Sequence, residues 1–300
     1  MKKLIVGVGI FVIIVVTIVT VKCDDIIYWY NHSLHEDEYV SIVPNNYFVE
    51  DNFLYVNNYD KSEIFNKRQL IDFIYYFINS GAESIKGYCN KEYTECINDI
   101  ELISSDQETL SILNNFVHPY NSFSEIEIKY NSKGDFTITL KKLYTSEQIN
   151  AINKAVDDFV KNNITNEMSV REKLKEVHDY IIDTTDYDTY KTDNIKDDTY
   201  FSQNAYRVLI EHYGICSGYS DAMAIFLNKL GVINYKVSNK DHIWNLAFVD
   251  GKWLHIDLTW DDPVSERNVN RDNYFLITTK QLNALADDSH DFNKHIFQEA

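Results

Sequence analysis

Hydrophobic residues follow three distinct patterns along this chain of 300 residues. The first is an unbroken apolar run from Leu4 to Val21, which directly follows Lys2 and Lys3. As a helix this run would be about 27 Å long, close to the ~30 Å hydrocarbon core of a bilayer. It predicts a single-pass membrane anchor over residues 1–23, with extracytoplasmic domains after it. Secretion after cleavage of a signal peptide is the alternative.

The second pattern covers residues 46–144, after a polar and aromatic stretch at 24–45 that is typical of a stalk. Here helical periodicity precedes strand-like alternation. Asn66 suits the N-cap of one helix, and Ser105 suits that of another. Alternating residues around a glycine-containing turn at 124–144 predict a β-hairpin. We expect a small α+β domain, and we find no pattern in it that indicates catalysis.

The third pattern, over residues 145–300, again begins with helices. Thr145 is followed three residues later by Gln148, and Ser169 is followed by Glu172. Both spacings are those of a capping box, in which the first side chain and the fourth residue satisfy each other's backbone N–H groups. We therefore expect a second domain that opens with two amphipathic helices.

A β-hairpin is predicted further along this domain, around Asp250-Gly251. This dipeptide suits a two-residue type I′ turn, which fixes the register of the flanking strands. With that register, His242 and Asp257 lie on one face of the sheet as diagonal neighbours, ~7 Å apart between backbones. A hydrogen bond from the imidazole of His242 to Asp257 would fix its tautomer and stabilise its charged form.

Cys216 stands where a helix is predicted to begin, in the stretch YGICSGYSDAM, and that helix is expected to end at Gly231. The unpaired N–H groups and the positive dipole at a helix start favour an anion, which lowers the pKa of a thiol. With His242 as its base and Asp257 behind the base, Cys216 is a candidate nucleophile. Two alternatives stay open: a small buried cysteine, and a metal site of His242, His255 and Asp257.

Two stretches, YGICSGYSDAMAIFLNKLG and HIWNLAFVDGKWLHIDLTWDD, resemble the transglutaminase-like domain superfamily, over about residues 165–262. The resemblance implies a papain-like α+β fold, in which the helix that carries the cysteine packs on an antiparallel sheet. It implies Cys216 as the nucleophile, His242 as base and acid, and Asp257 as the residue that orients the imidazole. Leu258 departs from the family, since many relatives have proline there.

The chemistry implied by the resemblance is acyl transfer from a protein or peptide amide through a thioester on Cys216, with no cofactor and no metal. Hydrolysis by a cysteine peptidase or amidase of the same fold is one alternative, and an inactive binding module is another. Gly218 would allow close approach of a substrate backbone. Further candidates for substrate or oxyanion contacts are Tyr187, Tyr190 and Trp244.

The remaining cysteines and the charge add two constraints. Cys89 and Cys96 are near enough in sequence to form a disulfide in an oxidising compartment, whereas Cys23 lies at the border of the predicted anchor. The formal net charge of −18 is spread along the chain. Because no basic cluster is present to neutralise phosphates, nucleic acid is not expected as a partner. The composition leaves the oligomeric state open.

Overall fold

The computed structural model of the protein describes residues 42–189, 203–262, 271–285 and 288–300. The predicted anchor, most of the predicted stalk and Tyr190 lie outside these residues. Residues 42–300 form one compact unit, and the boundary expected near residue 144 stays a prediction. Within the described ranges, no helix combines the length and the apolar character needed to cross a membrane.

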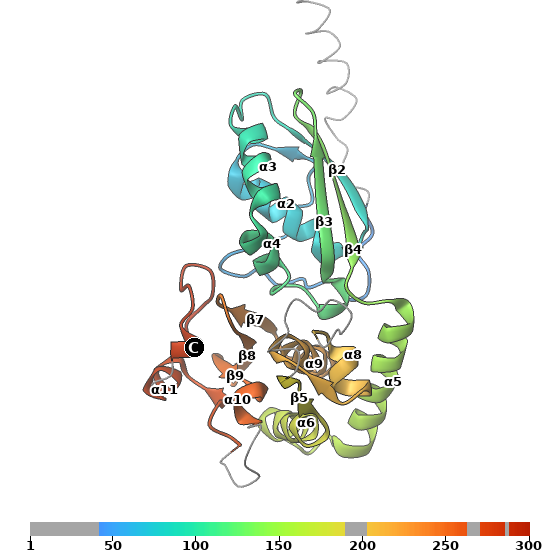
Figure 1. Ribbon diagram of the computed structural model, residues 1–300, viewed down its shortest axis with the longest axis vertical. Coiled ribbons are helices and arrows are strands. Elements are labelled where there is room, and N and C mark those ends of the chain that lie inside the picture. The colour runs from blue at the N-terminus through green and yellow to red at the C-terminus, as the bar shows by residue number, and fades with distance from the viewer. Residues whose placement is uncertain (1–41, 190–202, 263–270, 286–287) are drawn as a thin grey trace, which may run out of the picture. The chain divides into compact units, whose positions relative to one another are not determined.

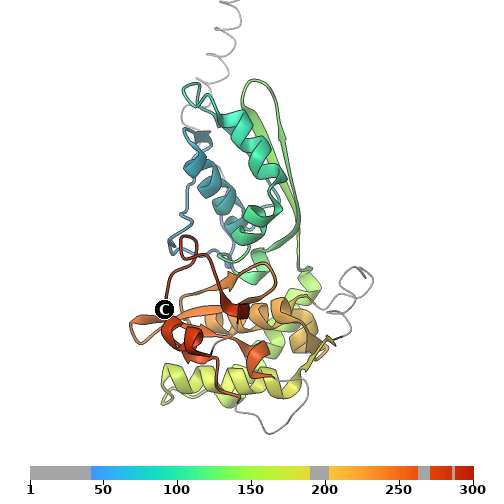
Figure 2. The ribbon, with the colours of Figure 1, turned by 60° about the vertical axis from the view of Figure 1, so that its left-hand side comes forward.

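The first part of the unit combines helices with a four-stranded sheet. Its elements in chain order are β1 (Glu63–Ile64), α2 (Lys67–Ser80), β2 (Ser84–Cys89), α3 (Cys96–Ser105), α4 (Gln107–Leu113), a 3-10 helix (Pro119–Asn121), β3 (Phe123–Tyr130) and β4 (Asp135–Lys142). The strands form a four-stranded sheet in the order β1-β2-β4-β3. Both ribbon views place the helices along one face of it (Figures 1 and 2). The predicted hairpin is thus β3 and β4.

Short polar side chains set the helix boundaries in this part. The side chain of Asn66 accepts the N–H of Gln69 at 3.0 Å, which confirms the predicted cap of α2. The prediction that Ser105 caps the next helix was wrong. Ser105 ends α3, and Asp106 caps α4 by accepting the N–H of Thr109 at 3.0 Å. A carboxylate one residue further on takes the capping role that the serine was expected to have.

A disulfide joins the end of β2 to the start of α3. Cys89 and Cys96 are bonded, with their Cα atoms 6.0 Å apart, which confirms the predicted pairing. Both are buried, and the hairpin turn between β3 and β4 packs against Cys89. At Gly134 the backbone has φ 95°, and an added Cβ would lie 2.9 Å from that of Cys89. Only glycine fits this turn without displacing the disulfide.

The second part carries the predicted cysteine helix and sheet. Its elements are α5 (Ser146–Asn163), α6 (Val170–Thr184), β5 (Asp186–Tyr187), α8 (Ala205–Ile210), β6 (Tyr213–Gly214), α9 (Cys216–Lys229), β7 (Asn234–Ser238), β8 (Ile243–Val249), β9 (Lys252–Ile256), α10 (Leu258–Asp261), β10 (Phe275–Ile277), α11 (Thr279–Ala284) and a 3-10 helix (Asp288–His290). Both predicted capping boxes are present, at the starts of α5 and α6. The sheet has the order β10-β9-β8-β7 and is antiparallel throughout. The mixed α+β class is confirmed.

The two faces of this sheet are covered by different parts of the chain. One face packs on α9, and α5, α6 and α8 close the same core. The other face is covered by aromatic rings, of which Phe53 and Phe116 lie 5.1 Å from the ring of Tyr235. Phe292, from the C-terminal segment, packs 6.0 Å from Trp244. Residues distant in sequence therefore enclose the sheet that holds the candidate site.

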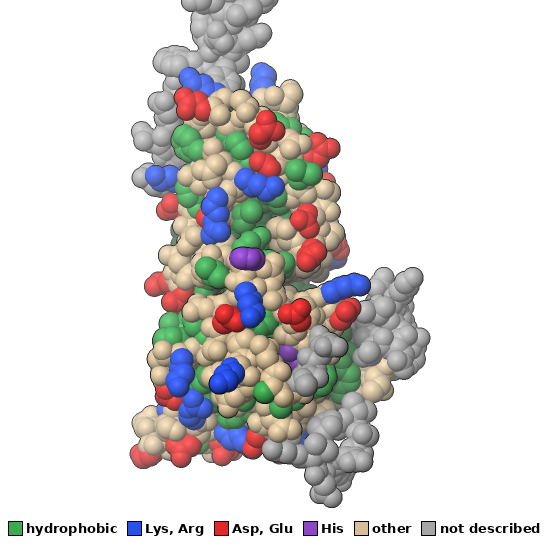
Figure 3. Space-filling model, turned by 90° about the vertical axis from the view of Figure 1, so that its left-hand side faces the viewer, with side chains coloured by type: hydrophobic (Ala, Val, Ile, Leu, Met, Phe, Trp, Pro, Cys, Tyr) green, Lys and Arg blue, Asp and Glu red, His purple; other side chains and the backbone are tan. Residues whose placement is uncertain are grey.

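The surface carries both signs of charge. On the face in Figure 3, acidic and basic side chains are interspersed, with hydrophobic side chains between them. The drawn face is that of an ordinary solvated protein surface, where apolar atoms supply much of the exposed area.

Replacing both Cys89 and Cys96 with alanine should lower the free energy of unfolding. The disulfide closes a short loop, with a sequence separation of 7, and constrains the unfolded chain by about 2–3 kcal/mol. Urea unfolding of the oxidised protein and of the double variant measures the difference. Cys216→Ala is the matched control and should keep the full stabilisation. Equal midpoints, or a linked peptide that contains Cys216 in a non-reducing digest, would contradict the pairing.

Candidate active site

Cys216 is the first residue of α9 and carries a free, partly exposed thiol. The first N–H to enter the helical ladder is that of Tyr219, which donates to the carbonyl of Ile215 at 3.1 Å. The N–H groups of Cys216, Ser217 and Gly218 precede that bond and face the space in front of the helix. The helix ends at Lys229, and Gly231, the predicted stop, follows two residues later with φ 71°.

Buried polar contacts fix α9 against the sheet. Asp221 in α9 accepts the Nζ–H of Lys236 in β7 at 2.5 Å and the hydroxyl of Tyr144 at 2.6 Å. The amide of Asn245 in β8 donates to the carbonyl of Ser220 at 2.9 Å. These buried contacts join α9 to β7 and β8, and so help to hold the cysteine helix in place relative to β8.

The hairpin that carries the histidine has the predicted register. Asp250 and Gly251 have φ values of 54° and 79°, as a type I′ turn requires, and Val249 pairs with Lys252. The pairing continues regularly to the last pair, in which Ile256 ends β9. His242 stands directly before β8, at the open end of the hairpin.

The expectation that Asp257 lies on the sheet face, within the strand, was wrong, because β9 ends at Ile256. Asp257 is the N-cap of α10, and its Oδ1 accepts the N–H and the hydroxyl of Thr259 at 3.0 and 2.6 Å. The N–H of Trp260 donates to the same oxygen at 3.3 Å. Capping turns the chain out of the sheet, and it fixes the carboxylate with its second oxygen toward the histidine.

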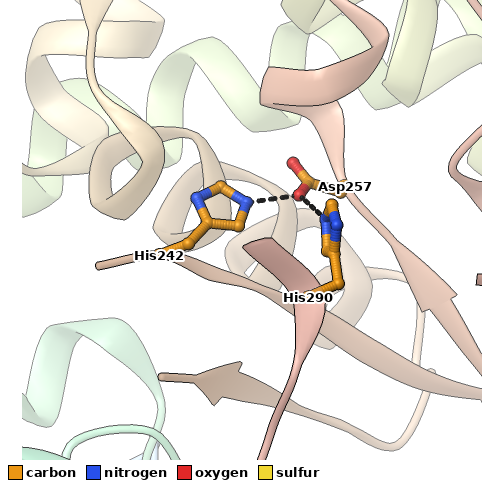
Figure 4. Close-up of side chains that lie close together, drawn as sticks. All are labelled: His242, Asp257 and His290. Atoms are coloured by element: carbon orange, nitrogen blue, oxygen red, sulfur yellow. Dashed lines mark hydrogen bonds and ion pairs between the residues drawn. The ribbon is translucent and has the colours of Figure 1, made fainter. Parts of the chain in front are cut away.

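His242 and Asp257 form the central contact of the site (Figure 4). The Nε2 of His242 lies 2.5 Å from Oδ2 of Asp257. The side chain of Cys216 lies near enough to the imidazole to favour its charged form. Since Nε2 faces Asp257, Nδ1 is the nitrogen left for the thiol. The structure therefore brings together the three residues that the sequence singled out: the cysteine, the histidine and the aspartate.

The charges of these groups reinforce one another. Burial alone would lower the pKa of His242, but the charge and hydrogen bond of Asp257, and the contact with Cys216, raise it to about 10. Burial would raise the pKa of Asp257, but the charge of His242 and hydrogen bonds from His242 and His290 hold it well below its usual range. The environment thus favours an imidazolium beside an ionised carboxylate.

A second histidine, His290, was not expected from the sequence. Its Nε2 lies 2.8 Å from Oδ2 of Asp257, the same oxygen that His242 contacts (Figure 4). The side chain is buried, and its ring stacks on that of Tyr274 with centroids 5.0 Å apart. Because His290 lies in a short 3-10 helix far along the chain from Asp257, no local spacing or periodicity could indicate it.

Trp244 packs against the ring of His242, and His255 holds Trp244 in place. The indole of Trp244 is stacked on the His242 ring, with centroids 5.6 Å apart and planes at 17°. Its N–H donates to Nδ1 of His255 at 3.0 Å, and Nε2 of His255 lies 3.0 Å from the hydroxyl of Thr279. Accepting from the indole requires a neutral His255, and burial together with the charge of His290 lowers its pKa to about 3.

The suggested metal set of His242, His255 and Asp257 is not assembled, because Trp244 and Thr279 engage both nitrogens of His255. The close group of possible ligands in the described part of the site is instead His242, Asp257 and His290. Hydrogen bonds already join its ligand atoms to one another.

The other sequence candidates lie in different surroundings. Gly218 is buried in the first turn of α9, directly behind the nucleophile. The ring of Tyr187, in β5, lies 6.2 Å from that of Tyr219. Trp244 is only 1% exposed, and its indole N–H already donates to His255. It is therefore not available to bind a substrate oxygen. The N–H groups at the start of α9 can bind such an oxygen instead.

Trp260 was not anticipated from the sequence. It is 40% exposed, and its ring lies 6.4 Å from that of His242.

A cavity of about 600 Å³ lies away from this chemistry. It is lined by Ile225, Asn228 and Lys229 of α9, and therefore opens near the end of the helix opposite Cys216. Its lining also includes His118 and Tyr120 from the first part of the unit. The three residues of the candidate site do not line it.

Comparison with known proteins gives the family of the second part. Residues 157–258 match the family model described as Transglutaminase-like superfamily, so this segment is a transglutaminase-like domain. No curated protein matches the chain. One solved structure, "Crystal structure of a TGase", is similar with 18% identity and a TM-score of 0.36 over 49% of this chain. The aligned part spans 47% of that chain, about half of its length.

His255→Asn should reduce the loss of stability in acid. The folded-state pKa of His255 lies below the ordinary value of 6.5, so its contribution is complete above pH 6.5 and is lost as pH falls toward 3. Each such group contributes about 1.4 kcal/mol per pH unit in that window. Asparagine can still accept from Trp244 but does not titrate. The free energy of unfolding between pH 6 and 4.5 should therefore fall less steeply. The exposed His295→Asn is the control, and an unchanged slope in His255→Asn would contradict the neutral tautomer.

Proposed function

We propose that the protein is a cysteine acyltransferase that acts on protein or peptide amides through a thioester. One observation carries the proposal: a free, partly exposed thiol at a helix start contacts an imidazole whose other nitrogen is held by a buried carboxylate. A nucleophile needs a base, and the base needs an orienting group, in this order of contacts. The match of residues 157–258 to the transglutaminase-like superfamily supports the same chemistry.

In the first step, the Sγ of Cys216 attacks the carbonyl carbon of the amide. The N–H groups at the start of α9 stabilise the negative charge that develops on the carbonyl oxygen. His242 then passes its Nδ1 proton to the leaving nitrogen as the C–N bond breaks, which leaves a thioester on the enzyme. Asp257 keeps the ring oriented and offsets its positive charge before the transfer.

In the second step, an amine attacks the thioester carbonyl and gives a proton to His242. The C–S bond breaks, the thiolate returns beside the imidazolium, and a new amide is released. Water in place of the amine would give hydrolysis with the same residues. The exposed indole of Trp260, near His242, provides an apolar surface for a substrate side chain.

We place this activity outside the cytoplasm, with the chain held at the membrane by Leu4 to Val21. The apolar run supports the anchor. The disulfide between Cys89 and Cys96 supports an oxidising compartment, because such bonds are rare in the cytosol. A substrate would then be a protein or peptide of the cell envelope or its surroundings.

Incubation with amide-containing peptides should produce an acyl adduct on Cys216, visible by intact-mass analysis. Adding a primary amine should release the acyl group as a new amide. Cys216→Ala should abolish the adduct, and His242→Ala should slow turnover by at least about 100-fold because the general base is lost. Cleavage without amine incorporation would replace transfer by hydrolysis. The absence of any adduct would favour a binding module.

Membrane association gives a second test of this proposal. The full chain should stay with membranes after a carbonate wash, and protease added outside the cell should digest it. A chain without residues 1–23 is the control and should be released. Recovery of the full-length product in the medium with a new N-terminus beyond residue 20 would show a cleaved signal instead.

A further inference from the structure

We propose that His290 is a positioning residue of this site, which holds the Asp257 carboxylate in competition with His242 and so limits how strongly the aspartate binds the catalytic imidazole. The inference deepens the proposed function and rests on it. His290 lies beyond residues 157–258, the part that matches the superfamily, so the C-terminal segment of this chain supplies it.

Asp257 is held at both oxygens. Its Oδ1 accepts from Thr259 and Trp260, which fixes the plane of the carboxylate. Its Oδ2 faces two imidazoles, with Nε2 of His242 at 2.5 Å and Nε2 of His290 at 2.8 Å (Figure 4). Because the carboxylate is ionised, it can only accept, and His290 must donate an N–H to it. Each donor therefore withdraws electron density from the oxygen that the other donor uses.

Asn239 sets the two histidines relative to each other. Its Oδ1 accepts the backbone N–H of His242 at 2.9 Å. Its Nδ2 donates to the carbonyls of Ser289 and Asp291 at 2.7 and 2.9 Å, on either side of His290. A single side chain thus joins the backbone of the catalytic histidine to the backbone of the second one. If His290 only filled space in the core, Asn239 would not need to bind the backbone on both sides of it.

Aromatic rings keep His290 in place. Tyr274 stacks on it at 23°, and the rings of Trp244 and Trp260 lie 5.0 and 5.1 Å away. The His290 side chain is buried, so water does not readily replace its bond to Asp257. Losing His290 would therefore leave Oδ2 to His242 alone.

Several ionisable groups of the described residues surround the pair. Cys216 and Asp257 face His242, while His255 interacts electrostatically with His290 and with Asp257. Asp261 lies one turn along α10 and senses the charge of Asp257. Tyr274 stacks on His290. Removing the donor His290 should strengthen the bond between Asp257 and His242, raise the pKa of His242 further, and make its proton harder to transfer to the leaving group.

The test compares His290→Met with His290→Gln in the full chain. Methionine keeps the length but has no donor, whereas the glutamine amide places an N–H near the position of Nε2. In His290→Met, kcat should fall about tenfold with KM little changed, and the alkaline limb of the rate profile should move up by about one pH unit. His290→Gln should restore both values toward those of the unmodified protein.

The titration of His242, followed through the NMR signals of its imidazole, gives a readout that needs no substrate. An upward shift in His290→Met that is reversed in His290→Gln supports the inference, even if acyl transfer itself is not found. If both variants leave the titration and the alkaline limb unchanged, the inference is wrong and the proposed function is untouched. Should His290→Met fail to fold, His290→Asn, whose shorter amide does not reach Asp257, takes its place against His290→Gln with the same two outcomes.

Discussion

The negative charge of Asp257, buried at the end of β9, is the constraint on which the site depends. A carboxylate removed from water is stable only when hydrogen bonds replace its hydration, and here the cap of α10 and two imidazoles supply them. The same contacts that offset its burial also orient His242. Structure and chemistry therefore meet at this residue, since Oδ1 caps α10 while Oδ2 binds the imidazole.

Local signals in the sequence predicted the larger part of this arrangement. The Asp250-Gly251 turn fixed the hairpin register, and capping boxes at Thr145 and Ser169 marked two helix starts. Cys216 was predicted at the start of its helix for the same reason, because turn and cap preferences act within a few residues. The family model matches the same region.

The errors and omissions arise where distant residues compete with local ones. Asp257 fits the alternation of a strand, but its carboxylate caps a helix in the structure, so the strand is shorter than expected. His290 and the bridging role of Asn239 depend on how the C-terminal segment docks on the sheet. No periodicity encodes such a contact, because it is set by tertiary packing.

The docking of that segment has a consequence for the order of assembly. The contacts of His290 with Asp257, and of Asn239 with Ser289 and Asp291, join residues 33 to 52 positions apart. Loop closure on this scale follows the formation of the helices and the hairpin. The cysteine helix and its histidine can therefore be folded while the aspartate still lacks its last donor. If the site has the proposed function, it is complete only when the C-terminal segment has docked on the sheet.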